Sequence, residues 1–395
     1  MPSPHAIIIA ARRTPIGRVG GSLKSLPVEA LMAPVLNALV QDADIDPHQV
    51  NEVILGNAVG PGGNPARLAL LTAGFPVTVA GVTVDRQCGS GLEAINLAAR
   101  LIQAGAGDIY IAGGVESVST APWRIDKPRS LYELPQFTHR ARFAPEAIGD
   151  PDMGVAAETV AQTYHISRDR QDEYAVRSHQ HALASIYTGR FHDEIVPIHL
   201  SAMTVVDTDE CPRPNLTVQR LGKLPPAFQA DGTVTVGNAC PINDGAAAVL
   251  MVSDRLFRSM KVRSGLRVVD AVAAGVDPTI LGMGPVAAIR KLLNRHPHLK
   301  LNEIERIEFN EAFAAQVLAC LDCLDISHDI VNVGGGAIAL GHPYGASGAI
   351  LVTRLFTELV RRHHANGSAQ RGLATLGIGG GLGLATLFDY VSSTT

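Results

Sequence analysis

Residues 84–94, VDRQCGSGLEA, join an apolar run of strand length to a helical pattern through small residues. The small residues after Cys88 would let another molecule reach the sulfur. The first N–H groups of the new helix would point at the same atom, and the positive end of the helix dipole favours thiolate over thiol. The stretch predicts a cysteine nucleophile at the start of a helix. A buried structural cysteine is the alternative, because free cysteine is among the most buried residue types.

Outward from this stretch, short apolar runs alternate with helical patterns, which is typical of α/β layers around mostly buried sheets. Expected strands cover residues 6–11, 52–57, 81–85, 108–112, 267–274, 306–310, 329–333, 373–378 and 384–390. Expected helices cover residues 27–40, 91–102, 167–189, 284–293, 311–321 and 346–362.

The two ends of the chain look like copies of one another. In each, a glycine-rich turn opens a helix that leads to a strand and a second run of glycines. Two such halves would pack together over a shared core. We expect an N-terminal half over residues 1–116, with part of 246–265 returning to it, and a C-terminal half over 266–395. Residues 117–245 differ in character and are expected to form an inserted loop domain that binds a ligand.

Composition excludes several classes of protein. With 46% hydrophobic and 18% charged residues, the chain can bury a large core, so disorder is not expected. The formal net charge is −4 and no basic run occurs, which argues against nucleic acid as a partner. No apolar run approaches the roughly 18 residues of a membrane span. Five cysteines without the spacing of a disulfide framework indicate a reducing compartment, and we expect a cytoplasmic protein. Cys320 and Cys323 have C-x-x-C spacing but no partner pair, so we expect a structural role for them and no bound metal.

Three further motifs carry groups that suit chemistry at a thiol. Residues 341–348, GHPYGASG, set His342 among glycines before a helix, where an imidazole can accept a thiol proton; a histidine held by its loop is the alternative. Asn310 follows an apolar strand and can hold a water or donate to an oxyanion, and Glu311 beside it can orient a histidine; a helix N-cap is the alternative. Residues 374–381, ATLGIGGG, can direct backbone N–H groups at a developing negative oxygen, or simply form a tight turn.

With these motifs in this order, the chain resembles the thiolases, which are acyl-CoA acyltransferases. The resemblance runs nearly end to end and includes AARRTPIG at 10–17, the Cys88 stretch, GNA at 237–239, NDGAA at 243–247, NEAF at 310–313 and GHP at 341–343. It implies a five-layered α-β-α-β-α fold built from two similar halves and a loop domain. It also implies an enzyme that acts on acyl-CoA thioesters without a permanently bound cofactor, as a homodimer or homotetramer.

The resemblance also implies roles for particular residues. Cys88 would be the acylated nucleophile and His342 would activate it. Asn310 would hold the water that forms one oxyanion hole with His342, and the N–H groups of Cys88 and Gly379 would form the other. Three positions fall on the family's coenzyme A side, which are Arg213, Phe228 and Cys240.

One departure from the family pattern bears on the chemistry. The thiolases carry a second catalytic cysteine before the glycine-rich turn, and here that position is Gly377. Glycine can neither remove nor return a proton, so condensation and thiolysis are expected to be impaired or altered, while acylation of Cys88 survives. Cys240-Pro241 also replaces the usual Ser-Gly, and Asp152 stands where short-chain members often carry histidine.

Two alternative functions stay open on the sequence. One is an acyl-CoA-binding protein or partner subunit without condensing activity. The other is a decarboxylating enzyme similar to the ketoacyl synthases, which would need no proton abstraction. The intact Cys88, Asn310 and His342 argue against a complete loss of chemistry, and the glycine-rich turn is more similar to that of the thiolases than to that of the synthases.

Overall fold

The computed structural model describes residues 4–138, 140–363 and 370–393. Ten strands of this part form one sheet: β1 (Ala6–Arg13), β2 (Gly17–Arg18), β3 (Glu52–Gly56), β4 (Ala80–Val84), β5 (Ile109–Ser117), β10 (Asn243–Ser253), β11 (Ser264–Gly275), β12 (Arg306–Phe309), β13 (Arg371–Ile378) and β14 (Leu382–Ser392). Their order across the sheet is β12-β13-β14-β11-β1-β10-β5-β3-β4, and β2 pairs with β10.

The helices run along the chain as α1 (Val28–Ala43), α2 (Pro65–Thr72), α3 (Ser90–Gln103), α4 (Met153–Thr163), α5 (Arg168–Tyr187), α6 (Val218–Leu221), α7 (Asp254–Ser259), α8 (Gly284–Arg295), α9 (Ala314–Leu324), α10 (Ala337–Leu340) and α11 (Tyr344–Phe356). Short 3₁₀ turns cover Pro47–Gln49, Val118–Thr120, Pro278–Met283, Leu301–Glu303 and His328–Ile330, and a π turn over Thr357–Arg361 extends α11. Two small hairpins pair β6 (Ile125–Asp126) with β7 (Gln136–Phe137) and β8 (Ile198–Ser201) with β9 (Thr204–Val206).

The two halves of the sheet repeat one pairing scheme. On one side β3 pairs with β5 in parallel, and β5, β10 and β1 follow as antiparallel neighbours. On the other side β12 pairs with β13 in parallel, and β13, β14 and β11 follow in the same way. In each half the helix before the inner parallel strand, α3 or α11, lies against that strand. The two halves meet where β1 pairs with β11 over Ile7 and Ile8.

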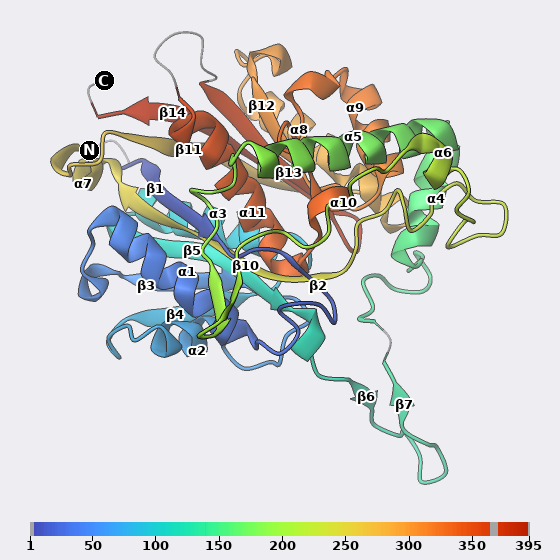
Figure 1. Ribbon diagram of the computed structural model, residues 1–395, viewed down its shortest axis with the longest axis horizontal. Coiled ribbons are helices and arrows are strands. Elements are labelled where there is room, and N and C mark those ends of the chain that lie inside the picture. Colours follow the sequence, from blue (N-terminus) through green and yellow to red (C-terminus); the bar gives the residue numbers. More distant parts are fainter. Residues whose placement is uncertain (1–3, 139, 364–369, 394–395) are drawn as a thin grey trace.

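Three hydrophobic clusters separate five layers. A central cluster includes α3 and α11, which pack against each other between the two sheet halves. A second cluster joins α1 and α2 to the outer face of the first half, and a third joins α8 and α9 to the outer face of the second. The arrangement is therefore α-β-α-β-α, as predicted, with the first turns of α3 and α11 both in the central layer (Figure 1).

The expected strand over 329–333 is wrong. Residues His328–Ile330 form a 3₁₀ turn, and only a single bridge joins Val331 to Ile307. Asn332 lies in the left-handed region at φ 46°, and its amide takes over the pairing by accepting from Phe309 N–H and donating to Phe309 C=O, both at 2.8 Å. The polar side chain thus replaces a strand that would be the counterpart of β4.

Two other elements differ from expectation. Helix α9 begins at Ala314 rather than at 311, with Phe313 as its N-cap residue, so Asn310 does not cap it. The sequence analysis also missed β10 as a strand, although it lies between β1 and β5 and is buried along its whole length. Its uninterrupted run of apolar and small residues lacks the alternation that marks a half-buried strand.

The inserted segment is anchored to the body by buried ion pairs. Glu194 accepts from Arg13 at 2.9 Å and from Arg354 at 3.0 Å, and Asp209 accepts from Arg13 at 2.7 Å. Arg13 lies on β1 and Arg354 on α11, so these pairs join both halves to the insertion. The β6–β7 hairpin, called the arm below, projects away from the rest of the molecule (Figure 1).

Candidate active site

Cys88 lies in a tight turn between β4 and α3. Gln87 before it has φ 50°, a left-handed conformation that is uncommon for a residue other than glycine and is often found at functional sites. Ser90 fixes the turn, because its hydroxyl accepts from Arg86 N–H at 2.8 Å and donates to Gln87 C=O at 2.6 Å. The turn leaves the thiol half-buried at the first turn of the helix.

Burial opposes the thiolate that the helix start was predicted to favour at Cys88. Burial raises the pKa of the thiol to about 12, and the negative charges of Glu116 and Asp85 act in the same direction. The backbone N–H groups of Cys88 and Gly379 oppose this rise in pKa, but they do not outweigh it. Cys88 is therefore a neutral thiol at neutral pH and needs a base to become a nucleophile.

His342 has the features of such a base. Its Nδ1 lies 2.6 Å from the Ser347 hydroxyl, and its backbone N–H donates to Asn243 Oδ1 at 2.9 Å. Burial lowers the pKa of the imidazole to about 4, so the ring is neutral at neutral pH. Nε2 has no hydrogen-bond partner among residues 4–138, 140–363 and 370–393, which leaves it available to accept a proton.

A large cavity opens in front of Cys88. It has a volume of about 810 Å³, within the range of small-molecule sites. Cys88, Gly379 and Tyr344 line its floor, Val59 and Phe143 lie beside them, and the arm contributes side chains to the wall. The wall residues from the arm and its base include Trp123, Arg124, Phe137, Thr138 and Arg140.

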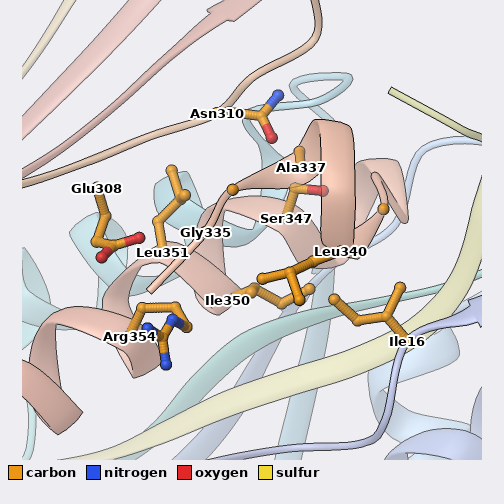
Figure 2. A pocket seen from close by; sticks show the side chains of 12 residues that line it. Ile16, Glu308, Asn310, Gly335, Ala337, Leu340, Ser347, Ile350, Leu351 and Arg354 are labelled. Carbon is orange, nitrogen blue, oxygen red and sulfur yellow. The ribbon is translucent and has the colours of Figure 1, made fainter. Parts of the chain in front are cut away.

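Asn310 lines a second, much smaller cavity, which is shown from close by in Figure 2. Its volume of about 20 Å³ is sufficient for one water. Ser347, which holds His342, lines this cavity together with Glu308 and Arg354. The Nδ2 of Asn310 is buried without a hydrogen-bond partner in the described part of the chain, so a water there would satisfy it. Glu311 does not orient His342, because its carboxylate accepts from Ser178, Tyr174, Asn332 and the Ile338 N–H instead.

Gly377 lies on β13, two residues before Gly379. A Cβ added at this position would lie 2.8 Å from Gln316 Nε2, while its other near neighbours are carbonyl oxygens at 3.4 Å and beyond. The amide of Gln316 thus reaches into the space beside residue 377. An amide exchanges no proton near neutral pH, so it is no substitute for a thiol as an acid or a base.

The three residues predicted on the coenzyme A side lie in different places. Cys240 is close to Cys88, because the charge on Cys88 contributes with burial to raising the pKa of the Cys240 thiol. Phe228 packs edge to face on Phe313, with ring centroids 6.0 Å apart. Arg213 lies outside the Cys88 cavity, on another of about 290 Å³, and its N–H donates to His179 Nδ1 at 3.1 Å.

Sequence reasoning missed two polar groups at the site. Glu116, at the end of β5, is buried and accepts from the N–H groups of Ala58, Val59 and Gly345 and from the Asn57 amide, and burial raises its pKa to about 7. Tyr344 sits inside the GHPYGASG motif, directly after His342-Pro343. The sequence could have indicated this group, because a tyrosine at the start of a buried helix brings a polar hydroxyl into the core.

The described residues contain neither a metal-binding cluster nor a membrane-spanning helix. In residues 4–138, 140–363 and 370–393 there is no group of three or more histidine, cysteine, aspartate or glutamate side chains arranged to hold a metal ion. No helix in the same ranges is both long and apolar enough to cross a membrane.

Comparison with known proteins identifies the family. The thiolase N-terminal domain matches residues 6–255 and the thiolase C-terminal domain matches residues 262–390. A Staphylococcus haemolyticus protein named as an acetyl-CoA C-acetyltransferase, VraB, is 49% identical over 387 residues, which are 98% of each chain. A Staphylococcus aureus protein of the same name is 47% identical over 386 residues, covering 97% of this chain and 99% of its own.

A solved structure agrees with this assignment. The Bacillus anthracis acetyl-CoA acetyltransferase matches with a TM-score of 0.91 and 39% sequence identity, covering 99% of this chain and 100% of its own. The predicted fold class is therefore confirmed. The chain belongs to the thiolase family of acyltransferases.

Proposed function

We propose that this chain is an acetyl-CoA C-acetyltransferase or 3-ketoacyl-CoA thiolase in which Cys88 carries the acyl group between two thiols. His342 takes the proton of the Cys88 thiol. The N–H groups of Cys88 and Gly379 stabilise one developing negative oxygen, and a water on Asn310 stabilises another together with His342. Coenzyme A enters and leaves with each turnover. The five cysteines are unpaired, as they would be in the reducing cytoplasm.

The observation that carries the proposal is the position of the Cys88 sulfur. Cys88 lines a cavity of about 810 Å³, and the backbone N–H groups of Cys88 and Gly379 act to lower the pKa of its thiol. These donors are fixed before any ligand arrives, which is the condition for stabilising charge as it develops in a transition state. A structural cysteine would need neither the cavity nor the donors.

Coenzyme A reaches Cys88 from the side of the inserted segment in this proposal. The guanidinium of Arg213 suits the phosphates at the nucleotide end. Cys240, close to Cys88, and Phe228, packed on Phe313, lie nearer the thioester end.

Mass spectrometry of the intact protein after mixing with acetyl-CoA tests the proposal. We expect one acetyl adduct on the wild type and none on Cys88→Ala. Cys323→Ala is the matched control, since this thiol is also half-buried but lies on α9, and it should keep the adduct. Binding of coenzyme A without an adduct on the wild type would contradict the proposal and favour the partner-subunit alternative.

Gly377 gives the decarboxylating alternative a specific basis. Loss of carbon dioxide from a malonyl thioester creates the carbanion without removal of a proton, so the absent thiol would not be needed. Incubation of acetylated enzyme with malonyl-CoA or with acetyl-CoA separates the two functions. Acetoacetyl-CoA formed only from malonyl-CoA would favour the decarboxylating enzyme, and its formation from acetyl-CoA alone would favour the thiolase.

We further propose that copies of the chain assemble into a homodimer or homotetramer through exposed apolar surface. The arm presents Leu131 and Tyr132, each 97% exposed, and large exposed apolar patches mark interaction sites in soluble proteins. A second apolar surface lies at the open edge of the sheet, where Val77, Val82 and Leu68 are exposed beside β4.

Charge on the arm should therefore reduce assembly. Replacing Leu131 and Tyr132 together with glutamate is expected to lower the molar mass in light scattering by about half, because two buried carboxylates per contact would be left without partners. Met203→Glu, at a residue 96% exposed on the β8–β9 turn, is the control and should leave the mass unchanged. An arm variant with the mass of the wild type would show that the arm makes no contact between copies.

A further inference from the structure

Tyr344 brings a phenol into the cavity that contains Cys88. It is the first residue of α11, and it lines this cavity together with Cys88 and Gly379. Its ring meets the His342 imidazole edge to face, with centroids 5.2 Å apart and an interplanar angle of 90°. The ring is thus packed against the proposed base, while the side chain faces the space in which a substrate would react.

The hydroxyl of Tyr344 is free to serve a ligand. It has no hydrogen-bond partner in the described part of the chain, and the residue is half-buried in the cavity wall. Burial and the charges of Cys88, Cys240 and Glu116 all raise the pKa of this phenol. The phenol is therefore protonated at neutral pH, and it shares a cavity with the Cys88 thiol.

The site needs a proton donor that β13 does not provide. Gly377 has no side chain, and the Gln316 amide beside it cannot give up a proton. Tyr344, Cys240 and Glu116 all interact electrostatically with Cys88, but the Glu116 carboxylate is already held by the N–H groups of Ala58, Val59 and Gly345. Tyr344 lines the reaction cavity and Cys240 does not, so the phenol has direct access to a bound substrate.

We propose that Tyr344 is the general acid that replaces the missing thiol at position 377. This inference rests on the proposed function, because it requires acyl transfer through Cys88. In thiolysis the Cys88 sulfur attacks C3 of a 3-ketoacyl-CoA, the C2–C3 bond breaks, and its electron pair stays on C2 of the departing acetyl-CoA. The Tyr344 hydroxyl then gives its proton to C2 and becomes a phenolate.

The second half of the cycle restores both groups. The thiol of an incoming coenzyme A gives its proton to the Tyr344 phenolate as its sulfur attacks the acyl group on Cys88. The bond between acyl group and Cys88 breaks, and the Cys88 sulfur takes back the proton that His342 had accepted. In condensation the same steps run in reverse, with the phenolate removing the proton from C2.

Tyr344→Phe tests this role, because it removes only the hydroxyl and keeps the ring against His342. We expect kcat for thiolysis of acetoacetyl-CoA to fall about 10²-fold with KM changed less than about threefold. Acetylation of Cys88 by acetyl-CoA should fall far less, because a coenzyme A thiolate can depart without a proton from Tyr344 whereas a carbanion at C2 cannot. Tyr187→Phe, at an exposed tyrosine on α5, is the matched control.

A second variant separates acid catalysis from a structural effect. If Tyr344 acts as an acid, Gly377→Cys should restore thiolysis to Tyr344→Phe, since the new thiol supplies the proton. Equal thiolysis by Tyr344→Phe and wild type would overturn the inference, as would a loss that Gly377→Cys does not repair or one produced by Cys240→Ala instead. Absence of an acetyl adduct on the wild-type protein would instead refute the proposed function on which the inference rests.

Discussion

Gly377→Cys is expected to raise thiolysis of acetoacetyl-CoA by up to about 10²-fold, because Tyr344 already supplies part of the roughly 10²–10⁴-fold that a positioned acid or base contributes. Residue 377 lies on β13, two positions before Gly379, whose backbone N–H helps to lower the pKa of the Cys88 thiol. A thiol has a pKa closer to neutrality than the raised pKa of the Tyr344 phenol, and is the better matched acid. Initial rates of acetoacetyl-CoA consumption at saturating coenzyme A measure the gain.

Gly377→Ala is the matched control for this prediction. It adds the same Cβ and therefore displaces the Gln316 amide by the same amount, but it has no acidic proton. Gly377 does not have a positive φ, so neither substitution strains the backbone. We expect no gain from alanine. A gain from alanine equal to that from cysteine would mean that displacement of Gln316, rather than a thiol, limits the reaction.

His342→Ala is expected to slow acetylation of Cys88 at pH 7 by roughly 10²–10⁴-fold. The cause is the protonation of the two side chains, because the Cys88 thiol has a pKa of about 12 and the His342 imidazole has a pKa of about 4. Both are neutral at pH 7, so the proton must move from Cys88 to His342 as the sulfur attacks. Rapid-quench mass spectrometry of the acetyl adduct measures the rate.

The pH dependence of Cys88 acetylation should differ between the wild type and the His342→Ala variant. Between pH 6 and 9 neither His342 nor Cys88 changes its protonation state, so wild-type acetylation should be nearly flat, apart from one shallow inflection where Glu116 titrates at about 7. The His342→Ala variant must rely on the thiolate fraction, which rises about tenfold per pH unit below the thiol pKa. Its rate should rise accordingly.

His298→Ala is the control, because this imidazole is exposed in the turn after α8. It should match the wild type in both rate and pH profile. A wild-type rate that itself rises tenfold per pH unit would contradict the assignment, because it would mean that Cys88 reacts from a pre-existing thiolate without help from His342.

Much of the architecture follows from local patterns. Alternation of strand and helix periodicity predicted β13 and β14 within two residues at each end, and it predicted α3 within one. These patterns are legible because each depends on neighbours a few positions away. The pattern failed at residues 329–333, where the Asn332 amide pairs with Phe309 in place of a strand backbone. That pairing depends on a residue 23 positions away, which periodicity does not reveal.

The order of the motifs was sufficient to place the chain among the thiolases and to single out Cys88, His342 and Gly377 for study. It was not sufficient for the electrostatics of the site. Cys88 is a neutral thiol because segments far apart in the chain bury it and raise its pKa. This effect is larger than the stabilisation of a thiolate that the local sequence predicts at the start of a helix. Likewise, only packing brings the Tyr344 phenol and the Cys240 thiol near Cys88, and sets Gln316 beside Gly377. Desolvation and long-range contacts are properties of the folded chain, so tertiary structure alone decides which groups hold protons here.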